Sequence, residues 1–334
     1  MIRWIVLTIL PLTIFAPSIW GEGTVNPVLT ILGHELNVKK TFGEDELFKP
    51  QQIIASGDEI FILDRGDETV KVYSKEGVYK TKIGGRGTGP GQVFFALNFD
   101  IANGKIFILD TMRQQIHMYL KDTRKYLHSK LYSLIFKGYS PHSIAVSQDE
   151  MFYFNTMVSV KGAKVITRLN TDLKSEFAFL DCIPVYKNEN ELRADKTSSP
   201  KWAVNLGHID LDANKVYFTY LLINKVLEFS KDGKMLNKYT LPLTSIDKTV
   251  KIIRFSNGSE GLKRRLNYDL KIRNHNIYVL SRDETGNSIL FELRDGAFKE
   301  IYRMKEELFG FEISGDKLYG IHDGEEGIYI YNLK

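Results

Sequence analysis

The stretch of this chain most suggestive of chemistry is a glycine-dense run, Gly84 to Gln92, which reads GGRGTGPGQ. Such runs often cradle phosphate groups. A Walker-type loop ends in Gly-Lys-Ser/Thr, whereas Gly89 is followed by Pro90. The glycine spacing also fails the dinucleotide fingerprint, and no helical pattern follows to supply an anion-binding N-terminus. We therefore predict a tight crossing between two strands, with Arg86 exposed at its tip.

Other catalytic signatures are missing from the sequence. It contains no Gly-x-Ser-x-Gly, no His-Glu-x-x-His and no pair of cysteines, since Cys182 is the only cysteine. We interpret Cys182 as a buried free thiol. The motifs therefore assign no catalytic residue.

The composition indicates a globular, exported protein. Of 334 residues, 43% are hydrophobic and 26% are charged, and a net charge of +4 is too small to suggest nucleic-acid binding. Residues 1–21 combine Arg3, an apolar run and small residues, which predicts a cleaved signal peptide. We expect a periplasmic or extracellular protein with no integral membrane span after cleavage.

Internal repeats predict the fold. Short β-branched and aromatic runs recur around six aromatic residues, at Phe61, Phe107, Phe152, Tyr217, Tyr278 and Tyr319. Each run is preceded by another apolar strand, and in all but the last unit it is followed by two more, with glycines in the turns. This pattern predicts an all-β, six-bladed β-propeller of four-stranded antiparallel blades as a single domain over residues 22–334. The two longest intervals between repeats place insertions at residues 182–205 and 243–265.

The last repeat contains only three strands, so closing the ring requires a strand from elsewhere. The segment Leu36–Phe42 has the pattern of an outer strand followed by a glycine. We predict that this segment completes the sixth blade and removes an exposed edge.

Units one and two resemble the NHL repeats of six-bladed β-propellers. The matching motifs are the glycine-rich run ending at Gln92, the strand Gly104-Lys-Ile-Phe-Ile-Leu-Asp110 and the strand Gln115-Ile-His-Met-Tyr119. The sequence departs from the NHL pattern at Val93, and units four to six keep only the hydrophobic skeleton. The resemblance implies a propeller fold with a central channel, and related lyases and lactonases hold a metal ion there.

Polar residues recur where the inner strand of each blade begins, at the mouth of the channel. We predict a ligand-binding set at this mouth that comprises Gln52, Asn98, His142, Ser143, His208 and Asp269 from these positions, Arg86 from the glycine-rich run, and His322 from the end of the aromatic strand of unit six. The resemblance allows a divalent metal held by His142 and His208 as an alternative. Without a third ligand in matching register these two histidines fall short of a zinc site, so we expect neither metal nor cofactor.

These observations favour a binding module over an enzyme. The first hypothesis is an exported NHL-like propeller that recognises a protein, peptide or glycan through the channel mouth and the inserted loops. The second is a metal-dependent hydrolase or lyase with its site in the channel. The third is a structural subunit of an envelope assembly.

Overall fold

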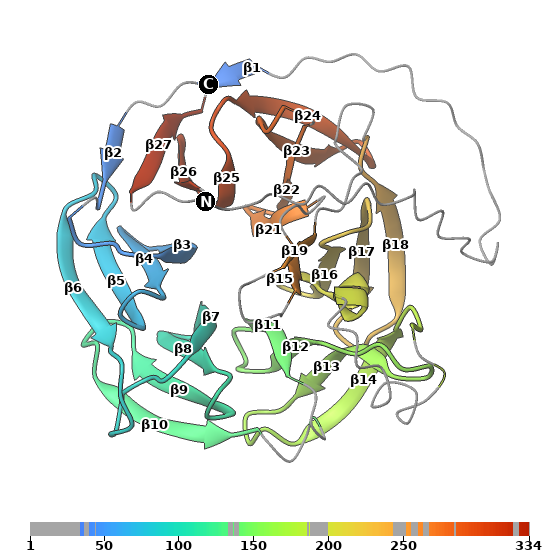
Figure 1. Ribbon diagram of the computed structural model, residues 1–334, viewed down its shortest axis with the longest axis horizontal. Coiled ribbons are helices and arrows are strands. Elements are labelled where there is room, and N and C mark those ends of the chain that lie inside the picture. Colours follow the sequence, from blue (N-terminus) through green and yellow to red (C-terminus); the bar gives the residue numbers. More distant parts are fainter. Residues whose placement is uncertain are drawn as a thin grey trace, which may run out of the picture. The chain divides into compact units, whose positions relative to one another are not determined.

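The predicted repeats fold as six antiparallel sheets arranged in a ring (Figure 1). This computed structural model describes residues 34–36, 40–43, 45–132, 136, 140–185, 187, 200–242, 252–254, 260–262, 267–283, 285–322 and 327–333. The predicted signal peptide lies outside these residues. Within them, the helical element is a 3₁₀ helix, η1 (Pro200–Asn205).

The first four blades each use four consecutive strands. Blade one contains β3 (Pro50–Ser56), β4 (Glu59–Asp64), β5 (Thr69–Ser74) and β6 (Tyr79–Gly84), and blade two contains β7 (Ala96–Ala102), β8 (Lys105–Asp110), β9 (Gln115–Leu120) and β10 (Tyr126–Leu131). Blade three contains β11 (Pro141–Val146), β12 (Phe152–Thr156), β13 (Lys164–Leu169) and β14 (Ser175–Asp181), and blade four contains β15 (Gly207–Asp212), β16 (Lys215–Tyr220), β17 (Lys225–Ser230) and β18 (Met235–Thr240).

The last two blades each gain a strand from the N-terminal part of the chain. Blade five contains β21 (Asn267–Arg273), β22 (Asn276–Arg282), β23 (Ser288–Arg294) and β24 (Ala297–Met304), and β1 (His34–Leu36) pairs in parallel with β24. Blade six contains β25 (Leu308–Ser314), β26 (Lys317–His322) and β27 (Ile328–Asn332).

The predicted ring closure is confirmed. Strand β2 (Lys40–Phe42) pairs antiparallel with β27 and becomes the outer strand of blade six, with Phe42 opposite Ile328. The closing strand is shorter than the predicted segment Leu36–Phe42, because Leu36 belongs to β1. Phe42 is buried and its ring centroid lies 5.0 Å from that of Tyr73, so the closure also contributes to the core between blades six and one.

The hydrophobic cores lie between neighbouring blades. Six of the clusters in the described part of the chain each join residues of two consecutive blades, and together they run once around the ring. Because strands alternate their side chains between two faces, each blade contributes to the core on both sides. The blades are therefore held by apolar packing, which leaves the inner edges free to carry polar groups.

One register differs from the sequence alignment. In five blades the repeated aromatic of the second strand, which the sequence alignment uses, pairs with the same position of the inner strand. In blade one this pair is Phe61 on β4 and Ile54 on β3. In blade three the hairpin between β11 and β12 is one residue longer, so Tyr153 and not Phe152 takes that place, opposite Ala145.

Candidate functional site

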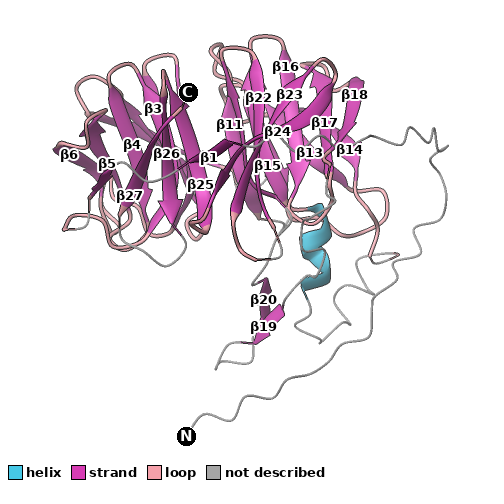
Figure 2. Cartoon of the chain, turned by 90° about the horizontal axis from the view of Figure 1, so that it is seen from above, coloured by secondary structure: helices cyan, strands magenta, loops and turns pink. Residues whose placement is uncertain are grey.

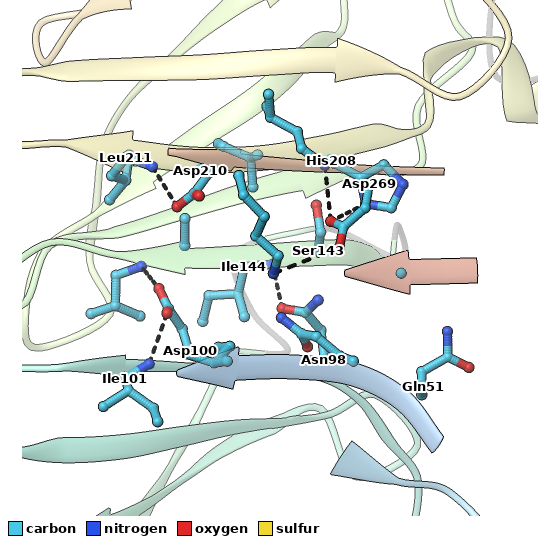
Figure 3. Close-up of a pocket in the computed structure, with 18 of the residues that line it drawn as sticks. Gln51, Asn98, Asp100, Ile101, Ser143, Ile144, His208, Asp210, Leu211 and Asp269 are labelled. Carbon is cyan, nitrogen blue, oxygen red and sulfur yellow. Dashed lines mark hydrogen bonds and ion pairs between the residues drawn. The ribbon is translucent and has the colours of Figure 1, made fainter. Parts of the chain in front are cut away.

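The inner strands of all six blades, β3, β7, β11, β15, β21 and β25, surround a central cavity of about 590 Å³. Each inner strand contacts the next, from β3 through β25 and back to β3. Figure 3 shows side chains from several of these strands pointing toward one another across this cavity. The cavity is therefore the channel that the repeat pattern predicts.

The structure brings most of the predicted site residues together. Six of the eight line the cavity, and these are Gln52, Asn98, His142, Ser143, His208 and Asp269. Gly310, the equivalent position of blade six, lines it too. Arg86 and His322 are not part of this lining.

Several of these side chains hold the next blade. The inner strand of a blade is an edge strand, so the N–H groups that point away from its own sheet need partners from elsewhere. The amide of Gln52 pairs with both the N–H and the carbonyl of Phe99, at 2.9 Å each. The Asn98 carbonyl accepts from the N–H of Ile144 at 3.1 Å, and Asp269 accepts from Phe311 at 3.2 Å.

A second layer of charged residues lies two positions further along the inner strands, and our sequence analysis missed it. Asp100, Asp210 and Lys271 line the cavity, and Glu312 occupies the equivalent position of blade six. The signal that could have found them is the period of two in a strand, which sends residue i+2 to the same side as residue i.

Ion pairs tie this second layer together. Arg273 forms hydrogen bonds to the buried carboxylate of Glu312 and lies 3.4 Å from the carboxylate of Asp210, so it joins blades four, five and six. Lys271 Nζ lies 3.7 Å from Asp269 and donates to the carbonyl oxygen of Ile53 at 3.3 Å. Since Ile53 belongs to blade one, Lys271 connects two blades that are not neighbours.

The channel shifts the ionisation of its acids. Burial and the nearby Asp210 carboxylate raise the pKa of Asp100 to about 7. Burial raises the pKa of Asp269 to about 6, and the positive charge of Lys271 opposes that rise. Burial also raises the pKa of Asp210, while the carboxylate of Glu312 raises that of Arg273 against the effect of burial. Asp100 and Asp269 therefore change charge near neutral pH.

The donors around the channel do not form a recognisable metal site. Within the described residues, no group of three or more histidine, cysteine, aspartate or glutamate side chains is placed to hold a metal ion. His208 Nδ1 lies 3.9 Å from Asp269 Oδ1 (Figure 3).

Asp64 and Asp110 have structural roles at the ends of β4 and β8. Asp64 accepts hydrogen bonds from the N–H groups of Phe48, Lys49 and Gly66, each at 2.8 Å, and pairs with the buried Lys71 at 2.6 Å. Asp110 accepts in the same way from Phe94 at 2.7 Å. Burial raises the pKa of both carboxylates, but Lys71 and the backbone hydrogen bonds at Asp64, and His117 and the backbone hydrogen bonds at Asp110, hold the pKa below its usual range.

The glycine-rich run is a crossing between blades one and two, as the sequence predicts. Its two ends are joined by the hydrogen bond from Val93 N–H to the Gly85 carbonyl, at 2.9 Å. Gly87 has a φ of 159° and any Cβ there would collide with the Gln92 side chain. The Arg86 guanidinium is largely exposed and lies 3.4 Å from the buried carboxylate of Glu68. Arg86 therefore supports the crossing from outside the channel.

His322 ends strand β26, beside the rim of blade six rather than in the channel. Its ring lies 5.3 Å from that of Tyr329, and its backbone pairs with Leu308. The equivalent positions of blades one and two are Asp64 and Asp110, which bind backbone groups of the loops. The structure therefore separates His322 from the other predicted ligand-binding residues.

Elements inserted between blades stand on one side of the ring (Figure 2). They are η1, which leads into β15, and the hairpin of β19 (Ile252–Arg254) and β20 (Glu260–Leu262), which precedes β21. Both lead into the start of an inner strand, where the channel mouth lies. Most of the two predicted insertions falls outside the described residues. Cys182, at the start of the first, is buried and free.

Comparison with known proteins supports a six-bladed propeller. A family model described as "6-bladed beta-propeller", DUF5128, matches residues 40–174, from β2 to the turn after β13. Among curated proteins no sequence matches this chain. These comparisons do not confirm the NHL resemblance, which stays a prediction.

Solved structures with the same fold belong to proteins of different kinds. One is a protein from Bacteroides fragilis thought to be exported, with a TM-score of 0.58 and 12% identity over 90% of this chain and 94% of that chain. Another is a member of the DUF4221 family from Bacteroides vulgatus, with a TM-score of 0.57 and 9% identity over 90% and 98%. A third is virginiamycin B lyase from Staphylococcus aureus, with a TM-score of 0.54 and 11% identity over 90% and 100%. At these identities the likeness concerns the fold alone.

Proposed function

We propose that this chain is an exported binding module of the NHL-like propeller type, which recognises a protein, peptide or glycan at the mouth of its central channel. The observation that carries the proposal is the cavity of about 590 Å³ lined by polar and charged side chains from the inner strands. Concave sites with a few convergent polar groups are where proteins usually bind ligands.

The placement of the insertions also favours recognition at the channel mouth. η1 and the β19–β20 hairpin precede the inner strands of blades four and five, and they project from one side of the ring (Figure 2). Loops added to a rigid scaffold commonly build its recognition surface. Export rests on the predicted signal peptide. No helix in the described parts of the chain is long and apolar enough to cross a membrane.

A metal-dependent hydrolase or lyase is the alternative, and its centre would be His142 and His208. Both histidines line the cavity, but the described residues offer them no third ligand in a metal-binding group. The binding module therefore accounts for the polar cavity without requiring a further metal ligand.

A bulky side chain introduced at the channel mouth tests the proposal. Gly310 lines the cavity, and a Cβ built there meets its nearest neighbour, Asp269, at 3.5 Å, which is an ordinary contact. Gly310→Trp therefore adds bulk inside the channel without backbone strain. The matched control is Leu236→Trp, which adds bulk at a residue 42% exposed on the outer strand β18.

The measurement is the rise in melting temperature of the purified protein when it is titrated with a panel of synthetic peptides and oligosaccharides. A ligand that stabilises the wild type and the Leu236→Trp protein, but not the Gly310→Trp protein, supports binding in the channel mouth. Ligands that stabilise all three proteins equally place recognition elsewhere and contradict the proposal.

A further inference from the structure

Arg65 lines the cavity without a full set of partners. It follows the end of β4, and its N–H donates to the carbonyl of Lys49 at 3.0 Å. Its guanidinium carbon lies 4.1 Å above the ring of Phe95. The guanidinium Nε is buried and finds no acceptor in the described part of the chain. A buried donor in this state at a cavity can be satisfied by a bound water or ligand.

The charge of Arg65 is also poorly compensated. Among the described residues, the opposite charge acting on it is that of Glu68. The Glu68 carboxylate is already engaged, because it accepts from the N–H of Ala96 at 2.7 Å and from Arg86 at 3.4 Å. Burial lowers the pKa of Arg65, which means that its environment disfavours the isolated positive charge. An anion placed in the cavity would relieve this cost.

Other residues around Arg65 extend the patch toward the surface. We define the blade 1–2 corner as Phe48, Lys49, Arg65, Phe94 and Phe95. Lys49 is exposed and lines the same cavity, so it adds a second positive charge. Phe48 is 57% exposed and Phe94 is 45% exposed, which is unusual for phenylalanine.

Packing places Phe48 beside the segment that carries Arg65. The Phe48 side chain lies against Gly66, next to Arg65, so closely that a Cβ on Gly66 would come within 2.4 Å of it. The carboxylate of Asp64 accepts a hydrogen bond from the N–H of Phe48, and that of Asp110 accepts one from the N–H of Phe94. The corner therefore combines a guanidinium stacked on an aromatic ring with two exposed aromatic rings on adjacent blade crossings.

We propose that the blade 1–2 corner is a subsite for an acidic peptide, with the peptide carboxylate on Arg65 and its apolar side chains against Phe48 and Phe94. This inference rests on the proposed function and names the ligand chemistry of the channel mouth. Arginine binds carboxylates through two parallel hydrogen bonds, and a ring beneath the guanidinium limits its motion. Exposed phenylalanine rings on both crossings favour a peptide with apolar side chains over a sugar acid.

The side-chain spacing of an extended peptide determines the choice of probe. Its alternate side chains point to the same side and are about 7 Å apart, because a strand rises by about 3.3 Å per residue. The probe therefore places a carboxylate at one position, for Arg65, and apolar side chains two residues before and after it, for the flanking rings. The probe is an acetylated and amidated pentapeptide of leucine, serine, glutamate, serine and leucine, whose glutamate carries its one charge.

The experiment compares this pentapeptide with the same peptide carrying glutamine in place of glutamate, by calorimetric titration of the full chain. A hydrogen-bonded charge pair in a partly buried site should make the glutamate peptide bind about tenfold tighter or more. Arg65→Gln should bring the ratio of the two dissociation constants to about one, and Arg65→Lys should restore part of it. The melting temperature should stay near the wild-type value, because the Arg65 guanidinium has few internal bonds to lose.

Arg294→Gln is the matched control for net charge. Its side chain is 56% exposed, it belongs to β23 of blade five, and it is not part of the cavity lining, so the peptide ratio should not change. An unchanged ratio in Arg65→Gln overturns the subsite. Absence of binding by the glutamate pentapeptide overturns it too, and so does tighter binding of a galacturonic acid trisaccharide, which would assign the corner to sugar acids.

The Gly310→Trp protein separates this inference from the proposed function. Loss of all binding in Gly310→Trp together with an unchanged ratio in Arg65→Gln leaves the channel mouth as the site and rejects the Arg65 subsite alone. Binding that persists in both variants rejects the channel mouth itself.

Discussion

Asp100 offers a direct test of the electrostatics in the channel. Burial and the Asp210 carboxylate raise its pKa from 3.8 to about 7, while Lys271 opposes the rise. The folded state therefore holds a proton on Asp100 between pH 4 and 7 that the unfolded chain has released. Because the folded state binds more protons in this range, its stability falls as the pH rises through it, and the loss is complete above pH 7.

The size of the effect follows from this pKa. Between pH 5 and pH 7 each pH unit lowers the free energy of unfolding by at most about 1.4 kcal/mol. The protein is therefore less stable at pH 8 than at pH 5 by an upper limit of about 3 kcal/mol. Water in the channel screens the charge, so we expect about 1 kcal/mol. The variant Asp100→Asn removes this titration. The two oxygens of Asp100 accept hydrogen bonds from the N–H groups of Val146 and Ile101, and the variant keeps only one of these oxygens. This loss lowers the free energy of unfolding by the same amount at every pH.

The assay is urea unfolding of the wild type and of Asp100→Asn at pH 5 and pH 8. We subtract the free energy of unfolding of the wild type from that of the variant. We expect this difference to be about 1 kcal/mol higher at pH 8 than at pH 5, because only the wild type loses stability as the pH rises. The control is Asp58→Asn, because the Asp58 side chain is fully exposed. If the difference between variant and wild type is the same at both pH values, Asp100 is ionised throughout and the reasoning is wrong.

Two other predictions concern the closure and the metal alternative. Phe42→Ala should lower the free energy of unfolding by about 3–5 kcal/mol, because it empties a buried site in the closing strand, whereas Thr41→Ala on the same strand should have a smaller effect. A melting temperature unchanged by Phe42→Ala would contradict the role of β2. Elemental analysis of the purified protein should find no divalent ion whose amount depends on His142 or His208. A stoichiometric ion that His142→Ala or His208→Ala removes would instead favour the metal-dependent enzyme.

The fold was largely predictable from the sequence because its signals are local and repeated. The six aromatic runs mark the second strand of each blade, and the missing strand of the last repeat led to β2. The one misaligned register, at Tyr153, comes from a hairpin one residue longer, with Glu150 at a φ of 57°. A single extra residue in a turn does not change the hydrophobic pattern that the alignment followed.

The candidate site was predictable only in part. Residues at the start of the inner strands were found because their positions repeat from blade to blade, and six of the eight line the cavity. Arg86, on the glycine-rich crossing, and His322, at the end of β26, do not come from an inner strand, and neither is part of the lining. Arg65 was missed because it follows a strand end in one blade, and its significance depends on Phe95 from the next blade. No spacing within a repeat encodes such a contact.

Hydrogen bonding separates the channel residues into two groups with different expected consequences. Gln52, Asn98 and Asp269 each satisfy a backbone N–H of the neighbouring inner strand, so their substitution leaves a buried donor without a partner and lowers stability. Loss of binding in such variants would therefore say little about ligand contact. Arg65 has hydrogen-bonding capacity that the described residues do not use. A loss of binding without a loss of stability is thus the result that distinguishes a ligand contact in this channel from a bond between blades.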